Sequence, residues 1–160
     1  MSSWQLQLAI LAEVFLAMVL GGSIGIERAT ANKSAGFRTH SLVAGAAALL
    51  VGVSDVLLYR FSPDMYTTDL IRSDPIRVIQ AIIAGISFLG AGTIFKHPRK
   101  QHVEGLTTAA SLLFSGAIGI CVALRQFMLA VAVTLLTVVV LRSVDFIERW
   151  IKQSDDDAEG

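Results

Sequence analysis

Charge and cysteine are scarce in this sequence. Charged residues make up 16% of its 160 residues, against about 25% in an ordinary soluble domain. Thirteen basic and thirteen acidic residues balance, so no excess of positive charge is available to attract DNA or RNA. We therefore exclude a nucleic-acid-binding protein. The single cysteine, Cys121, excludes a disulfide within the chain.

Catalytic patterns are missing as well. The sequence has no P-loop, no dinucleotide fingerprint and no Ser–His–Asp arrangement. His97 and His102 are five residues apart on a predicted loop, a spacing that is not typical of a zinc site. We predict that the protein is not an enzyme.

Apolar residues, by contrast, make up 54% of the chain and are gathered in long runs. Each run is nearly free of charge and close to the length that crosses a bilayer core of about 30 Å. We predict five transmembrane helices, at Leu6–Ile26, Thr39–Leu58, Ile76–Phe95, Leu106–Leu124 and Phe127–Asp145. The runs lack the alternation of membrane β-strands. The predicted fold is all-α, a polytopic helix bundle over residues 1–152, followed by a short acidic disordered tail at 153–160.

The boundaries of the third, fourth and fifth runs need local signals. Asp74 is expected to cap the third helix and Pro75 to be its first residue. One helix from Leu106 to Val144 would measure about 58 Å, nearly twice the bilayer core. We therefore expect two spans joined by a tight turn at Leu124–Phe127. Four spans with one re-entrant segment are the alternative.

The positive charges predict the orientation. With five spans, one side of the membrane holds nine basic residues: Arg28, Lys33, Arg38, Lys96, Arg99, Lys100, Arg142, Arg149 and Lys152. The other side holds four: Arg60, Arg72, Arg77 and Arg125. Because basic loops stay in the cytoplasm, the N-terminus is predicted outside and the C-terminus inside. The basic inner loops would also attract anionic lipid headgroups.

Small residues recur on several predicted spans. In lipid, such residues let helices approach each other closely. Gly21 and Gly25 are four apart on the first span, Gly85 lies on the third, and Ser115 and Gly119 are four apart on the fourth. They predict a compact bundle and permit a homo-oligomer.

One acidic residue, Glu13, falls inside the first predicted span. A carboxyl group at that depth is costly and marks an ion path, a proton relay or a satisfied ion pair. Asp55 and Gln80 fall near the same end of their spans. Because Mg²⁺ prefers oxygen ligands, we predict a hydrated-cation or proton site formed by these three residues, with Glu13 and Asp55 as metal ligands. The alternative is that Asp55 pairs with Arg60.

Polar and glycine-rich motifs gather at the predicted inner face. They are Gly25-Ile26-Glu27-Arg28, Ala35-Gly36-Phe37-Arg38-Thr39-His40, Phe88-Leu89-Gly90-Ala91-Gly92 and Gly105-Leu106-Thr107-Thr108-Ala109-Ala110. With these motifs in this order, the sequence resembles the MgtC/SapB family of bacterial inner-membrane proteins over roughly Leu6 to Leu141.

The residues of these motifs suggest a polar cap. Glu27 is expected to pair with Arg28 or Arg38, while Thr39 and His40 supply hydrogen-bonding groups at a helix N-terminus. This cap either fixes the inner loops or forms a site for a ligand or partner.

Two further motif pairs have expected structural roles. Thr107 and Thr108 are expected to satisfy the free N–H groups that begin the fourth helix. Gly90 and Gly92 are expected to let the third helix approach its neighbours closely.

The resemblance implies a role in adaptation to low Mg²⁺ and, in pathogens, in survival inside host cells. It favours a regulator of a membrane partner such as an ATPase, with a direct Mg²⁺ or proton transporter as the rival and a scaffold for anionic lipids as a third hypothesis. Members similar to MgtC also carry a folded cytoplasmic C-terminal domain, whereas this sequence ends in the acidic segment 153–160.

Overall fold

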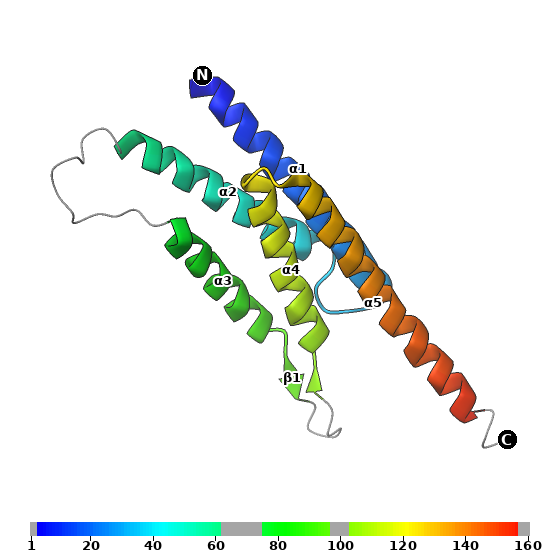
Figure 1. Cartoon of the computed structure of the whole chain (residues 1–160). Coiled ribbons are helices and arrows are strands. Elements are labelled where there is room, and N and C mark those ends of the chain that lie inside the picture. Colours follow the sequence, from blue (N-terminus) through cyan, green and yellow to red (C-terminus); the bar gives the residue numbers. More distant parts are fainter. Residues whose placement is uncertain (1–2, 62–74, 97–102, 157–160) are drawn as a thin grey trace.

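The computed structural model describes residues 3–61, 75–96 and 103–156, and these ranges are almost entirely helical (Figure 1). They form five helices: α1 (Ser3–Thr30), α2 (Phe37–Phe61), α3 (Pro75–Ala91), α4 (Leu106–Ala123) and α5 (Phe127–Asp156). Two short antiparallel strands, β1 (Phe95–Lys96) and β2 (Val103–Glu104), connect α3 to α4. The predicted all-α bundle is confirmed.

Three of these helices are long and apolar enough to cross a membrane. They are Trp4–Thr30, Phe37–Leu57 and Leu106–Ala123, while the apolar parts of α3 and α5, Ile76–Ala91 and Phe127–Ser143, are shorter. Large apolar side chains cover the outside of the bundle, including Phe15, Phe88 and Met128. Such a surface suits contact with lipid.

The tight turn predicted between the fourth and fifth spans is present. Arg125 has a left-handed backbone with φ 59°. Its N–H donates to the carbonyl of Val122, and the N–H of Gln126 donates to that of Cys121, each at 2.9 Å. This is the Schellman arrangement that ends many helices, in which glycine usually takes the left-handed position. Two separate helices joined by this turn therefore follow Gly105.

The third helix is shorter than predicted. It begins at Pro75 as expected, but it ends at Ala91 and not at Phe95. After it, the N–H and the hydroxyl of Thr93 both donate to the carbonyl of Gly90, at 2.9 and 2.7 Å, which turns the chain toward β1. The predicted cap, Asp74, lies outside the described residues.

The fifth helix is longer than the predicted span. It continues past Asp145 to Asp156, so that residues 153–156 of the predicted tail lie in α5. Residues 157–160 lie outside the described ranges.

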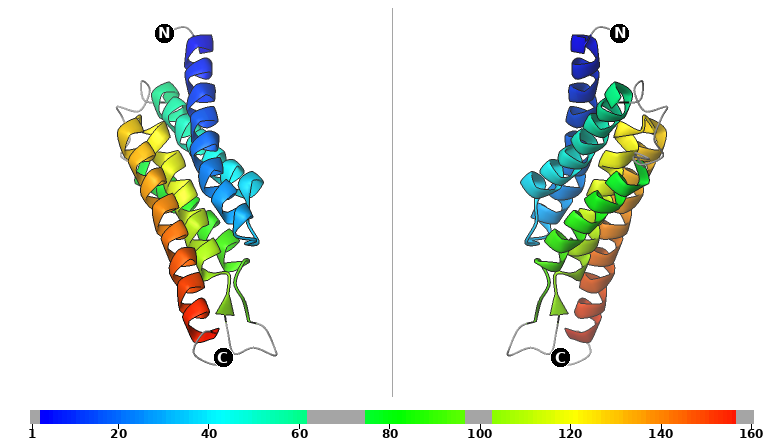
Figure 2. Two further views of the ribbon diagram at one scale, coloured as in Figure 1. Left: turned by 90° about the vertical axis from the view of Figure 1, so that its right-hand side faces the viewer. Right: turned by 90° about the vertical axis from the view of Figure 1, so that its left-hand side faces the viewer.

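Helix α4 lies at the centre of the bundle, because it contacts each of the other four helices (Figure 2). Helices α1 and α2 pack on one another and on α4, whereas α3 contacts α2 and α4, and α5 contacts α1 and α4. Small and branched side chains form the core, including Ala17, Ile24, Ala44, Leu112 and Ile118.

Glycine allows the closest of these approaches. A Cβ atom added at Gly21 would lie 2.6 Å from Cβ of Ala44, and one added at Gly25 would lie 2.6 Å from Cα of Phe37. Gly119 of α4 faces the carbonyl of Ala44 so closely that an added Cβ would overlap it. The predicted packing role of these three glycines is therefore visible in the contacts between α1, α2 and α4.

Candidate functional site

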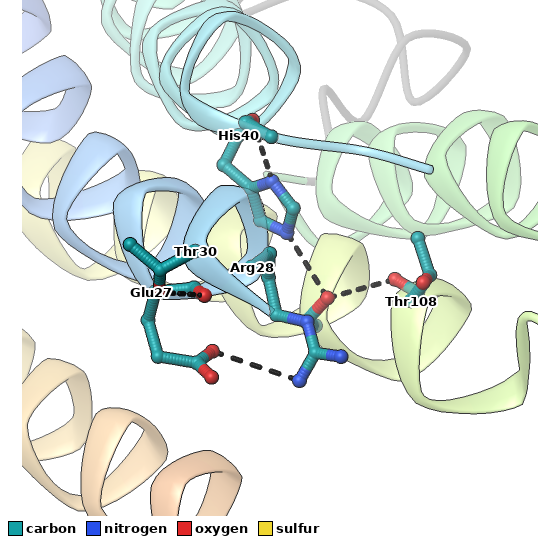
Figure 3. Close-up of polar contacts among 7 residues, drawn as sticks. Glu27, Arg28, Thr30, His40 and Thr108 are labelled. Carbon is teal, nitrogen blue, oxygen red and sulfur yellow. Dashed lines mark hydrogen bonds and ion pairs between the residues drawn. The ribbon is translucent and has the colours of Figure 1, made fainter. Parts of the chain in front are cut away.

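Polar side chains are buried mainly at one end of the bundle, which we call the Glu27 end. It holds the α1–α2 loop and the β1–β2 strands, and the opposite end, the Arg125 end, holds the α4–α5 turn (Figure 1). Five residues of α1, α2 and α4 form what we call the His40 cluster: Glu27, Arg28, His40, Thr108 and Ser111 (Figure 3). Each is at most 4% exposed.

His40 connects α2 to α4 at the centre of this cluster. Its Nδ1 lies 2.9 Å from the carbonyl oxygen of Gly36 and its Nε2 lies 3.0 Å from Oγ of Ser111. A carbonyl oxygen only accepts, so Nδ1 carries a proton. Ser111 Oγ also lies 2.9 Å from the carbonyl oxygen of Thr108.

This chain of contacts can accommodate His40 in two protonation states. When the ring is neutral, Ser111 donates its one hydroxyl proton to Nε2. When the ring is charged, Nε2 donates to Ser111 and the hydroxyl donates to Thr108. The contact between His40 and Ser111 is therefore kept in either arrangement.

Glu27 and Arg28 lie in the last turn of α1, next to His40 (Figure 3). Nη1 of Arg28 lies 3.6 Å from Oε2 of Glu27, which confirms one of the two expected ion pairs. Within the described part of the chain, Nε and Nη2 of Arg28 are buried and have no hydrogen-bond partner. A buried guanidinium with free donors is costly. The contact of Arg28 with Glu27 offsets part of this cost.

Three other motif residues at the Glu27 end are exposed and lie outside the His40 cluster. Arg38 and Thr39 lie in the first turn of α2 with exposed side chains, and Thr107 is also exposed. The predicted capping role of Thr107 and Thr108 is wrong, because Gly105 is the N-cap of α4 and no side chain caps it. Gly105 has φ 95°, and an added Cβ would overlap the carbonyl of Thr93.

The glycines of the predicted third span have different roles from one another. Gly90 lets α3 approach α4, because a Cβ added there would lie 3.3 Å from Cβ of Ala109. Gly92 lies just after α3, and a Cβ added there would meet only the carbonyls of Leu89 and Phe88, so its predicted role in helix contact is wrong. Gly85 has nothing within 4 Å of an added Cβ, so the predicted packing contact there is wrong as well. Ser115 is buried, and its hydroxyl donates to the carbonyl of Ser111.

At the Arg125 end, Glu13 forms an ion pair. Its Oε1 lies 3.2 Å from Nε of Arg125, which follows α4 in the tight turn. The Glu13 side chain is 13% exposed, whereas that of Arg125 is 64% exposed. For Glu13 we expected an ion path, a proton relay or a satisfied ion pair, and the structure shows the ion pair.

The predicted oxygen cluster forms only in part. Glu13 and Asp55 line one cavity of about 380 Å³, together with Gly52 and Arg125. Gln80 does not line this cavity and is exposed on α3, so its expected place in the site is wrong. Among the residues that the structure describes, no three His, Cys, Asp or Glu side chains lie close enough to hold a metal ion. The side chain of Arg60, the alternative partner of Asp55, lies outside them.

Two residues that complete these sites were not singled out from the sequence. Arg125 was counted only among the four basic residues of the predicted outer side, and not as a partner of Glu13. Ser111 was not named as a candidate, and its contact with His40 joins positions 71 residues apart. Only the rotation of each helix, which hydropathy does not specify here, brings these side chains together.

Comparisons with known proteins agree with one another. The MgtC family model matches residues 14–150. Protein MgtC from Salmonella typhimurium is 37% identical over 136 residues, which cover 85% of this chain and 52% of that protein. "Putative magnesium transporter YhiD" from Escherichia coli K12 is 36% identical over 128 residues, or 80% of this chain and 57% of that protein.

A protein from Haemophilus influenzae is 35% identical over 144 residues, which are 90% of this chain and 59% of that protein. The chain therefore spans between half and three fifths of the length of these relatives. No solved structure matches it significantly.

Proposed function

This chain belongs to the MgtC family, which supports a role in Mg²⁺ homeostasis for a multi-pass membrane protein, and we propose that it acts by regulating a membrane partner such as an ATPase. In this proposal it does not carry Mg²⁺ itself. The protein lies in the bacterial inner membrane, with its N-terminus outside and its Glu27 end in the cytoplasm.

The observation that carries this proposal is the ion pair of Glu13. A carrier needs a carboxylate within the bundle that is available to a cation. Glu13 instead lies 3.2 Å from the guanidinium of Arg125. A divalent cation at the same carboxylate would have to displace Arg125 or lie beside its positive charge, which is unfavourable.

The His40 cluster supports the same proposal from the other end of the bundle. Its five side chains are at most 4% exposed and join α1, α2 and α4. The contact of His40 with Ser111 joins the first turn of α2 to α4. We infer that it holds the cytoplasmic surface in a fixed shape that a partner can recognise.

A direct Mg²⁺ or proton transporter is the second candidate. The observation that favours it is the cavity of about 380 Å³ that both Glu13 and Asp55 line. In this alternative, a hydrated cation enters between α1 and α2 and Arg125 swings away, which its 64% exposure would permit.

The proposed regulation is tested by measuring ATP hydrolysis in membranes that contain candidate partners. Inverted membrane vesicles from bacteria that lack MgtC-family proteins are fused with liposomes that contain the purified protein, and ATP hydrolysis is measured at low Mg²⁺. The proposal predicts that the rate changes on addition of the protein and that the Glu13→Gln variant has the same effect. An unchanged rate in vesicles that have demonstrably incorporated the protein would contradict it. Empty liposomes are the control.

A further inference from the structure

A long apolar groove lies between α2 and α3 and shares no lining residue with the His40 cluster or with the cavity at Glu13. Its volume is about 710 Å³. Leu42, Ala46 and Leu50 of α2 form one wall, and Ala81, Gly85 and Leu89 of α3 form the other. Leu42, Leu50 and Leu89 are each more than half exposed, so the groove is open along the surface of the bundle.

Small side chains on α3 create the width of this groove. A Cβ atom added at Gly85 would meet nothing within 4 Å. Helix α3 rests on α4 instead, through Gly90 against Ala109 and through Ile86 against Gly116. The space beside Gly85 is therefore part of the fold, and the helix does not need that glycine for contact with its neighbours.

The one charged residue of the groove lies at its end. Arg77 is in the first turn of α3, where this helix begins at Pro75, and its side chain is exposed. Within the described ranges, neither of the two ion pairs involves it. A cation at the start of a membrane helix lies at the depth of lipid phosphates, with which arginine forms strong paired hydrogen bonds.

The length of the groove matches one leaflet of a bilayer. From Arg77 to Leu89, α3 rises by about 18 Å at 1.5 Å per residue. Half of a hydrocarbon core measures about 15 Å. A helix of a partner protein would not require a cation at one end of the groove.

We propose that this groove binds a single membrane phospholipid, with one acyl chain between α2 and α3 and the phosphate on Arg77. The occupant follows from the charge at one end, the apolar walls and the one-leaflet length. The inference is independent of whether the protein regulates a partner or carries an ion.

The test is native mass spectrometry of the full chain released from detergent micelles, titrated with dioleoylphosphatidylglycerol. Arg77→Gln should weaken lipid binding about tenfold, as expected for the loss of a charge-assisted hydrogen bond to the phosphate. Gly85→Leu should weaken it about tenfold or more, because the added side chain displaces at least two methylene groups of the acyl chain. Ala81→Leu is a second groove-filling variant, should either one fail to fold.

Matched controls separate the groove from the rest of the surface. Ala84→Leu adds the same bulk to an exposed position of α3 that does not line the groove, and Arg142→Gln removes an exposed arginine from α5. Both should bind the lipid as the wild type does. Dioleoylglycerol, which lacks the phosphate, should bind the wild type and Arg77→Gln equally weakly.

Two outcomes would overturn the proposal. One is that both groove-filling variants bind phosphatidylglycerol as tightly as Ala84→Leu does, which would place the lipid elsewhere. The other is that these variants convert a dimer into a monomer while lipid binding is unchanged. The groove would then be the contact between two copies of the chain.

Discussion

Arg125 has a left-handed backbone, which is typical of glycine, and it also carries a charged side chain that forms an ion pair. Its left-handed backbone, with φ 59°, occupies the position in which glycine ends most such helices. Its side chain pairs with Glu13, the carboxylate that lies within the predicted first span. The side chain therefore accounts for the presence of a non-glycine residue in a strained turn.

The two roles of Arg125 can be separated by substitution. Arg125→Ala and Arg125→Gly both remove the ion pair with Glu13, but only glycine adopts the left-handed conformation without strain. We expect the glycine variant to be more stable than the alanine variant by about 1 kcal/mol. Denaturant titration in detergent micelles measures the difference. Equal stability of the two variants would show that the turn is not strained.

His40 is the residue on which the cluster at the Glu27 end depends most. His40→Ala removes a fully buried ring and breaks its contacts with the Gly36 carbonyl and with Ser111, although that carbonyl still accepts the backbone N–H of residue 40 and Ser111 still donates to Thr108. We expect the free energy of unfolding to fall by about 2–3 kcal/mol, since the substitution breaks two hydrogen bonds and leaves a cavity in place of the ring. Thr39→Ala, at the exposed neighbouring position, is the control and should change it by less than about 0.5 kcal/mol. A similar small effect at both positions would rule out the cluster as a source of stability.

At the scale of the helices, α4 organises the bundle by approaching α2 very closely. Gly119 faces the backbone carbonyl of Ala44, where no side chain fits. Gly85 of α3 has open space instead. The same residue type therefore marks a helix contact in one place and the wall of a groove in another.

This difference predicts opposite effects of one substitution. Gly119→Ala must push α2 away from α4 and should destabilise the protein by about 1–3 kcal/mol, as overpacking does. Gly85→Ala meets no atom and should leave stability unchanged or raise it by up to about 1 kcal/mol, because alanine favours a helix. Thermal unfolding of both variants in the same detergent measures the contrast. A stabilised Gly119→Ala variant would contradict the close contact.

The sequence predicts the helices better than their ends and their faces. Hydropathy and length identify all five, because a lipid environment requires long apolar helices. The end of α3 at Ala91 depends on the hydrogen bonds of Thr93, and the start of α4 depends on the left-handed Gly105. Such local bonds leave little trace in composition.

For the candidate sites, the sequence predicted several of the residues but not which of their side chains meet. Glu13 could be singled out from its depth, and Glu27 with Arg28 from their adjacency. The exclusion of Gln80 and the contact of His40 with Ser111 depend on how each helix is rotated in the bundle. With small residues on several faces, hydropathy leaves that rotation open.

For the whole molecule, the orientation in the membrane remains a prediction from the basic loops. Single cysteines at Ser34 and Gln126, in a Cys121→Ser background, test it because both positions are exposed at opposite ends of the bundle. A maleimide that cannot cross membranes should label the Gln126→Cys variant in intact cells. It should label Ser34→Cys only after the cells are opened. The reverse pattern would place the Glu27 end outside.

Because Glu13 is paired with Arg125, we propose that this protein does not itself carry Mg²⁺. A measurement of Mg²⁺ flux across a membrane tests this proposal most directly. The purified chain is reconstituted in liposomes that contain a Mg²⁺-sensitive dye, and external Mg²⁺ is added, with an ionophore as the positive control. We predict that Mg²⁺ enters no faster than into empty liposomes. Mg²⁺ entry that requires the protein and is abolished by Glu13→Gln would contradict the regulator and identify a carrier.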